Sequence, residues 1–358
     1  MAFSLLWTLD IAKSLSGLQK SLSFIAIPLV FFFFPKFNKE RLNTIFRVYS
    51  FAMILYCFFY LIMAFLNYFE TNVTSCFFYN NLVPEDPGAI YMSVFASFAL
   101  FYFVQLNNRK TIEKIALSVL ILFLFLLSSK SIITIDFIII VCYYAFFAKI
   151  SSSTKTLTII SVSLFLFFSI FFVKEVKHRF MIEYETAFVD NTLQNSLEDE
   201  KKGKIHNVSI KEAWNNKTFH ESDFFPGTAL RVYQVRIFKE MLADNNIFFK
   251  GFGIEASQAH IREKAKMYKL FYDYGEYNFH NQYIQTFAEL GIFGLLILGF
   301  MLFLNIKKAL AKKDFLHIAF AITMIMLFLS ESFFCRQRGI VFFILLFCLF
   351  NSSSNEEK

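Results

Sequence analysis

The sequence predicts an all-α protein: a polytopic bundle of transmembrane helices with one large, partly helical loop outside the cytoplasm. Three observations predict this fold class. The chain of 358 residues is 56% hydrophobic and only 18% charged, which is poorer in charge than ordinary soluble domains. Several apolar runs approach the roughly 20 residues that cross a bilayer. One long polar stretch, residues 174–283, separates two groups of these runs.

Nine apolar runs, each bounded by charged or turn residues, are the predicted spans. They divide the chain into an N-terminal bundle of about six spans (1–173), the long loop (174–283) and a C-terminal bundle of about three spans (284–358). The runs lie at 21–35, 48–67, 89–106, 115–128, 132–148, 157–173, 284–305, 316–331 and 339–350.

Basic residues set the predicted orientation. Four links are rich in Lys and Arg and are expected in the cytoplasm: 36–47, 107–114, 149–156 and 306–314. The long loop holds equal numbers of acidic and basic residues, so these links account for the net charge of +7. The basic balance therefore indicates membrane orientation and not a nucleic-acid partner.

The same count places the N-terminus outside the cytoplasm, because nine spans separate it from a cytoplasmic C-terminus. No cleavable signal peptide is visible, since Asp10 and Lys13 interrupt the first apolar run. Either residues 1–19 insert partially or earlier spans are missing from this chain. We favour the second interpretation.

Within the long loop, the stretch from Thr228 has the period of an amphipathic helix. Its apolar face consists of Leu230, Tyr233, Ile237, Met241 and Leu242. We expect this helix to lie on the membrane or against the bundle. The Gly-Phe-Gly at 251–253 that follows is expected to form a tight turn; a lone G-x-G is no nucleotide motif.

A polar stripe enters the span that begins near Asn281. Gln282, Gln285 and Glu289 share one helix face, and an ionisable residue at membrane depth is a site candidate by default. His280 and Asn281 lie directly above this stripe. They could simply cap the helix, but His280 is also suited to act as a general base near neutral pH.

Cationic side chains on the expected outer face form a second group of candidates. A guanidinium grips phosphate oxygens with two parallel hydrogen bonds, although it could equally contact a lipid headgroup. If the outer turns converge, these residues form a cationic pocket suited to a diphosphate. The candidates are Arg231, Arg236, Lys130, Arg336 and Arg338.

The five Cys have no metal-type spacing, and the sequence contains no P-loop, HExxH, GxSxG or EF-hand pattern. We therefore expect neither a metal nor a cofactor.

Several of these pieces together resemble a known family. The GFG turn followed by FHNQYIQTFAELGIFGLLILG is similar to the O-antigen ligases and O-antigen polymerases of the bacterial envelope. Arg231 opening its helix, the turn SSKS at 128–131 and the stretch SESFFCRQRGIVFF extend the resemblance. Two features depart from it: Lys130 stands where the family usually has Arg, and the family usually has about twelve spans.

The resemblance implies an inverting, metal-independent glycosyl transfer at the periplasmic face of the bacterial inner membrane, among membrane lipids. The donor would be a glycan on undecaprenyl diphosphate. A ligase would transfer it to a sugar hydroxyl of the lipid A-core, and a polymerase to a second lipid-linked glycan. His280 would act as base, and Arg231, helped by Lys130 or Arg338, would hold the diphosphate. A transporter with a large external loop is the alternative outside this class.

Overall fold

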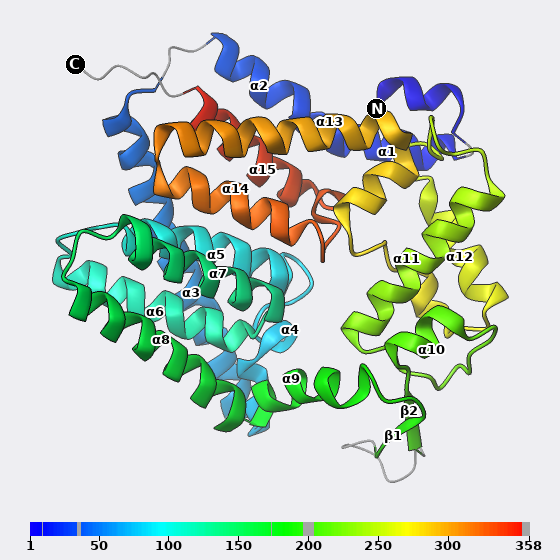
Figure 1. The fold of residues 1–358 in the computed structure, drawn as a ribbon, viewed down its shortest axis with the longest axis horizontal. Helices are drawn as coiled ribbons and strands as arrows, with labels where there is room; N and C mark the ends of the chain where they lie inside the picture. The colour runs from blue at the N-terminus through cyan, green and yellow to red at the C-terminus, as the bar shows by residue number, and fades with distance from the viewer. Residues whose placement is uncertain (9, 34–36, 173, 196–203, 353–358) are drawn as a thin grey trace. The chain divides into compact units, whose positions relative to one another are not determined.

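A computed structural model describes residues 1–8, 10–33, 37–172, 174–195 and 204–352 of the chain. Almost all regular structure in these residues is helical, and their only sheet is one antiparallel pair of short strands. The predicted all-α polytopic bundle is confirmed (Figure 1).

The elements follow one another in this order. The first part of the chain forms α1 (Ile11–Ser21), α2 (Ser23–Phe33), α3 (Lys39–Thr71), α4 (Tyr79–Leu82), α5 (Ala89–Val104), α6 (Thr111–Leu127), α7 (Lys130–Cys142) and α8 (Ser152–Phe172). The long loop forms α9 (Lys174–Thr186), β1 (Thr192–Asn195), β2 (Lys204–Asn207), α10 (Ile210–Asn215), α11 (Gly227–Asp244) and α12 (Ser257–Met267). The last part forms α13 (Gln282–Lys312), α14 (Phe315–Leu327) and α15 (Gln337–Asn351).

Each of the nine predicted spans coincides with a helix, from α2 to α15. The ends of two predicted spans, at 34–35 and 173, lie outside the described residues. Among the residues that the structure describes, four helical stretches are long and apolar enough to cross a membrane: Ile11–Phe33, Lys39–Thr71, Lys130–Phe147 and Gln282–Lys312. Three shorter apolar helices, α5, α14 and α15, accompany them.

The chain divides into two compact units. The first consists of Met1–Phe24, His178–Met301 and Phe328–Ile340. The second consists of Ile25–Lys177, Leu302–Leu327 and Val341–Lys358. The division expected from the sequence, at 173 and 283, stays a prediction.

The second unit is built around α5. Nearly every residue of this helix is buried, because it packs against α3, α6, α7 and α14. A helix that is apolar on all sides needs such neighbours. One polar pair lies inside this packing, where Asp136 of α7 is within 2.6 Å of the Ser97 hydroxyl.

The first unit is built around α11. Its predicted apolar face is confirmed: Tyr233, Ile237 and Met241 are buried, and Leu230 and Leu242 pack beside them. Most of its partners lie in the long loop, which is large enough to form a hydrophobic core of its own. This face packs against α10 and α12, and also against Ala288 of α13, a helix of the predicted C-terminal bundle.

The Gly-Phe-Gly turn docks on a break in α13. Gly291 interrupts the helix with φ +67° and ψ −165°, which leaves helix backbone groups without their usual partners. Residues 248–253 supply those partners. The backbone amides of Phe252 and Gly253 donate to the carbonyls of Ala288 (2.8 Å) and Glu289 (3.0 Å), and the Ile292 amide donates to the Phe248 carbonyl (2.8 Å).

Candidate active site

The site is organised by the turn at residues 328–334, which hydrogen-bonds to the start of α13. The Gln282 amide donates to the Phe328 carbonyl at 2.8 Å, and the Phe334 amide donates to the Gln282 side-chain oxygen at 2.7 Å. The side chain of Asn281 donates to the Leu329 carbonyl at 3.1 Å. Residues about 50 positions apart in sequence are thereby held side by side.

Arg231 reaches the same turn from α11. Its Nε donates to the Ser330 carbonyl at 3.0 Å, and its Nη1 donates to the Gly227 carbonyl one helical turn back at 3.1 Å. The side chain is half-buried. Within the described part of the chain, Nη2 donates to no protein acceptor, so one edge of the guanidinium stays available for an anion.

His280 lies two residues before α13, in a left-handed backbone conformation with φ +43°. The helix cap is supplied by its neighbour: the Asn281 side-chain oxygen accepts from the Ile284 amide at 3.0 Å. The His280 amide donates to the Asn278 side chain at 2.8 Å. The imidazole takes no part in capping and is about one-quarter exposed, which leaves it free for chemistry.

Glu331 lies beside this imidazole. Its Oε2 is 3.5 Å from Nδ1 of His280, and the Glu331 side chain is almost fully buried. Neither atom has a hydrogen-bond partner among the described residues, so their contact is an ion-pair distance and not a formed hydrogen bond. A carboxylate facing Nδ1 favours the tautomer in which Nδ1 carries the proton, so that the lone pair of Nε2 can accept one.

A second contact from α11 places His280. The side-chain amide of Gln234, which is buried, donates to the carbonyl of Asn278, two residues before the histidine. Gln234 and Arg231 are one helical turn apart, so α11 contacts both the histidine segment and the 328–334 turn. The Tyr277 ring lies 5.8 Å from the imidazole, centroid to centroid. Three chain segments therefore meet at this site.

A family model described as O-antigen ligase matches residues 115–299, just over half of the chain. This chain belongs to the O-antigen ligase family. No curated protein matches it. Members of this family are membrane enzymes of the glycosyltransferase type, either ligases or polymerases, that act on lipid-linked glycans.

In this O-antigen ligase family member, the polar stripe of α13 is largely occupied by structural contacts. Gln282 binds the 328–334 turn and is also within 3.0 Å of the Thr286 hydroxyl. Gln285 donates to Glu289 at 2.6 Å and lies 3.2 Å from the Ser257 hydroxyl of α12. The stripe thus faces the protein interior, and its N-terminal end leads to His280.

Arg236 lies in a different environment from Arg231. Its guanidinium donates to the carbonyls of Ala213 and Asn216, to Glu240 at 3.1 Å and to the Tyr268 hydroxyl at 2.8 Å. Burial, followed by the hydrogen bond to Glu240, raises the pKa of the Tyr268 hydroxyl. All three guanidinium nitrogens of Arg236 are used to join α10, α11 and α12, so we leave it out of the proposed site.

The remaining cationic candidates lie in different places. Arg336 and Arg338 follow the 328–334 turn in the first unit; Arg336 is exposed and Arg338 is half-buried. Lys130 begins α7 in the second unit. Roles for all three stay predictions.

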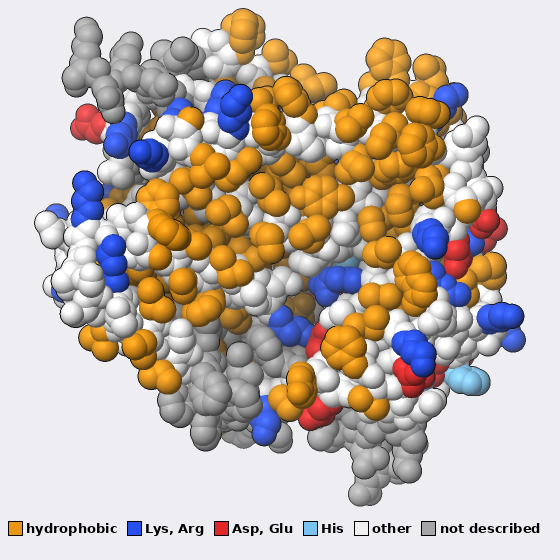
Figure 2. All heavy atoms as spheres, in the orientation of Figure 1, with side chains coloured by type: hydrophobic (Ala, Val, Ile, Leu, Met, Phe, Trp, Pro, Cys, Tyr) orange, Lys and Arg blue, Asp and Glu red, His pale blue; other side chains and the backbone are white. Residues whose placement is uncertain are grey.

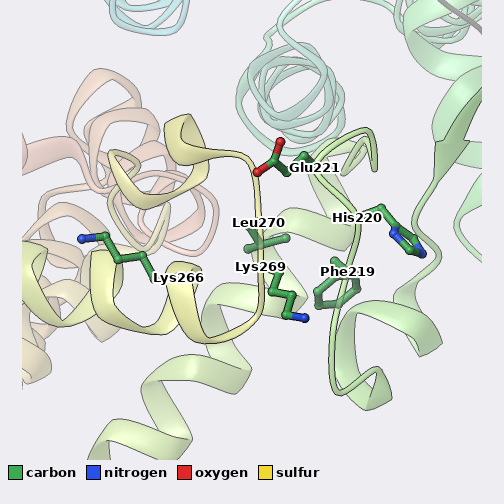
Figure 3. A pocket seen from close by; sticks show the side chains of 6 residues that line it. All are labelled: Phe219, His220, Glu221, Lys266, Lys269 and Leu270. Carbon is green, nitrogen blue, oxygen red and sulfur yellow. The ribbon is translucent and has the colours of Figure 1, made fainter.

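A shallow pocket of about 440 Å³ occurs elsewhere in the first unit (Figure 3). In the figure, Lys266 points away from the other labelled side chains. No predicted site residue lines this pocket. Its lining residues are Phe219, His220, Glu221, Lys266, Lys269 and Leu270.

Two residues of the site were not among the sequence candidates: Glu331 and Gln234. Glu331 stands beside Ser332 at the edge of an apolar run. A carboxylate buried there without a partner would be costly, and this cost is the sequence feature that could have identified Glu331 as a site residue. Cys335 nearby is not a candidate nucleophile. Burial, followed by the neighbouring carboxylates of Glu289 and Glu255, raises the pKa of its thiol well above the usual value.

Proposed function

We propose that this protein is an O-antigen ligase that transfers a glycan from undecaprenyl diphosphate to a hydroxyl of a lipid A-core sugar. One observation carries the proposal: the 328–334 turn contacts Arg231, whose Nη2 has no protein acceptor among the described residues, and places Glu331 beside the imidazole of His280. A base beside an anion-binding group is the pair that this transfer requires.

His280 is the general base of the proposed reaction. The acceptor hydroxyl gives its proton to Nε2 as its oxygen forms a bond to the anomeric carbon of the donor. The bond between that carbon and the diphosphate oxygen breaks, and its electron pair leaves with the diphosphate. Attack opposite the leaving group inverts the anomeric configuration.

Arg231 binds the departing diphosphate. Negative charge accumulates on the leaving oxygen as the bond breaks, and a fixed guanidinium that donates to it lowers the barrier. The bonds to Ser330 and Gly227 hold the guanidinium in place before the donor arrives. Arg338, in the same unit, is the expected additional cation, and the role expected for Lys130 of the second unit stays a prediction. This arrangement neutralises the diphosphate with side chains, and we therefore expect activity to survive a metal chelator.

Glu331 positions His280. Its carboxylate lies on the Nδ1 side of the ring, holds the tautomer with Nε2 unprotonated, and stabilises the imidazolium that forms when the acceptor proton arrives. Burial strengthens this interaction, because little water screens the pair.

The proposal places the active face in the periplasm and the spans in the inner membrane. A polymerase would use the same donor and the same base, and it differs only in its acceptor. The test is the envelope glycan pattern of a deletion strain. If the deleted protein is a ligase, the lipid A-core of this strain carries no polymer, and polymer accumulates on the lipid carrier. Single repeat units on lipid A-core would instead identify a polymerase.

The same strain also tests the site when it is complemented. The wild-type gene should restore the polymer to lipid A-core, and a gene carrying His280→Asn should not, at equal protein abundance. Unchanged envelope glycans in the deletion strain would contradict both the ligase and the polymerase assignments.

A further inference from the structure

The helix α1 has three distinct flanks. Its apolar residues recur at helical spacing on one flank, and three of them have more than half of their surface exposed: Ile11 at 62%, Leu15 at 53% and Leu22, just after the helix, at 58%. Lys13 and Lys20 lie on the opposite flank. Ser14, Gly17 and Ser21 form the third flank and are buried. The side that α1 presents to the protein is therefore its small, polar side.

The small flank is attached to the loop that follows the Gly-Phe-Gly turn. The Ser14 hydroxyl donates to the Ile254 carbonyl at 2.8 Å. A Cβ on Gly17 would lie 3.0 Å from the Glu255 side chain, so only glycine allows this approach without displacing it. Lys20 completes the attachment through an ion pair with Glu255 at 2.6 Å. These contacts hold α1 against residues of the long loop.

The preceding turn continues the same arrangement. Ser4 is buried beside Ile254, and Trp7 donates its indole N–H to the Lys250 carbonyl at 3.1 Å. The side chains of Phe3 and Leu6 are not buried in this attachment, and 78% and 81% of their surface is exposed. Figure 2 shows hydrophobic side chains gathered over the end of the first unit where the N-terminus lies. The apolar surface thus extends from residue 3 to residue 22.

We propose that α1 and the turn before it lie in the membrane interface, on the same side as the long loop, with the Ile11–Leu15–Leu22 flank buried in lipid. The occupant of this surface is the boundary between phospholipid headgroups and acyl chains. In the sequence, α1 is followed directly by α2, whose eleven residues carry no charge and include no buried residue. This continuity connects the exposed flank to a membrane segment.

The composition of α1 fits an interface better than water or hydrocarbon. In water, the Ile11–Leu15–Leu22 flank would be an exposed apolar strip with no partner. In the hydrocarbon core, Asp10, Lys13 and Lys20 would be charges at membrane depth, which is costly. In the interface, the Ile11–Leu15–Leu22 flank enters the acyl region, and Lys13 and Lys20 stay among the headgroups. Asp10, Lys13 and Lys20 all lie near charged residues of the loop, as the interface position requires.

The proposal is independent of the transfer reaction, and its test uses fluorescence. In a full-length chain with Trp7→Phe and Trp214→Phe, one new tryptophan is placed at Leu15 or at Ser16, two exposed neighbours that point in different directions around α1. The proteins are reconstituted in bilayers that carry bromine near the headgroup or near the chain ends. A tryptophan at Leu15 should be quenched best by the shallow bromine, at roughly 5–10 Å below the headgroups.

The matched control is Ser16→Trp, which should respond to a water-soluble quencher and be quenched by lipid at most about half as strongly as Leu15→Trp. Strongest quenching by the deep bromine at both positions would show a transmembrane α1 and overturn the proposal. Absence of lipid quenching at Leu15 would also overturn it, since water or a protein partner would then cover this flank. Ile11→Trp, on the same flank, repeats the measurement if Leu15→Trp does not fold.

Discussion

At the scale of single residues, the role of each polar side chain in the site follows from which of its atoms are already bonded. Arg236 uses its three guanidinium nitrogens within the protein, and Asn281 uses both atoms of its amide. Within the described residues, Nη2 of Arg231 has no protein acceptor, and the His280 imidazole lies beside the Glu331 carboxylate and the Tyr277 ring. Judged by residue type alone, these four side chains are equally good site candidates. Their hydrogen bonds indicate that Arg236 and Asn281 are structural, whereas Arg231 and His280 are available to the substrate.

The first prediction concerns His280. We expect His280→Asn to insert normally and to transfer glycan about a hundredfold or more slowly, because a base contributes roughly 10²–10⁴-fold to rate. Asn tolerates the left-handed conformation at this position, so the fold should be kept. The measurement is transfer from purified lipid-linked donor. The control is Asn281→Ala. This variant lacks the helix cap, and the protein should therefore be destabilised by about 1 kcal/mol. Near-normal turnover in His280→Asn would exclude the histidine as base.

The second prediction concerns Arg231. Arg231→Lys should abolish most of the transfer, because a point charge cannot make two parallel hydrogen bonds to a diphosphate. The exposed ion pair of Arg262 with Glu276 provides the control, since Arg262→Lys keeps its charge in water and should leave transfer unchanged. Transfer is measured with and without EDTA. If EDTA abolished transfer and magnesium restored it, a metal ion and not Arg231 would be the group that neutralises the diphosphate.

The third prediction concerns Glu331. Glu331→Gln keeps the size of the side chain and removes its charge, so turnover should fall by more than about tenfold while KM for the donor changes little. Glu331→Asp, which restores the charge on a shorter side chain, should recover part of the turnover. A rise in KM with unchanged turnover would indicate that Glu331 binds substrate and does not position the base.

At the scale of elements, the site depends on a broken helix and the loop that completes it. Gly291 interrupts α13 two residues after Glu289, and residues 248–253 bond to the freed backbone groups. A Cβ on Gly251, which has φ +67°, would lie 2.3 Å from the Glu289 carbonyl carbon. The approach of two backbones therefore requires glycine at 251. This docking joins the loop from α11 to the helix that begins beside His280.

The fourth prediction tests this docking. Gly251→Ala should destabilise the protein by at least about 2 kcal/mol, from the left-handed conformation and the backbone clash together. Gly299 of the same helix α13 provides the control, since a Cβ there meets nothing within 4 Å. Gly299→Ala should be neutral or stabilising by up to about 1 kcal/mol. Thermal unfolding of the two purified variants in one detergent compares them. Equal midpoints would contradict the docking argument.

At the scale of the whole molecule, the long loop is a folded part of the protein and not a connector. It has its own hydrophobic core around α11 and carries Arg231, Gln234 and the segment that ends at His280. The second unit is a helical bundle around α5. The positive charge of the links 36–47, 107–114, 149–156 and 306–314 predicts which side of the membrane each loop occupies.

The fifth prediction is that the long loop lies outside the cytoplasm. Asn215 is exposed at the end of α10, so a cysteine placed there should react with a membrane-impermeant thiol reagent in cells whose outer membrane alone is permeable. The parent chain, labelled in parallel, accounts for its own cysteines. Labelling that requires lysis of the inner membrane would reverse the orientation.

Sequence by itself determined the fold class and the amphipathic helix α11, and it supplied the predicted spans and the two central residues of the proposed site, Arg231 and His280. These conclusions depend on local composition and helical period, which are properties of neighbouring residues in the chain. The family resemblance was equally local, since its most specific part is the continuous stretch from Phe279 to Gly299.

Only the tertiary structure decided the rest. It paired Glu331 with His280, placed Gln234 against Asn278, assigned the helix cap to Asn281 and engaged Arg236 in a structural network. It also directed the apolar face of α11 into the loop's own core and the small flank of α1 onto residues 254–255. Each of these outcomes joins segments far apart in sequence. Periodicity shows which face of a helix is apolar, but the packing of the whole chain determines what that face contacts.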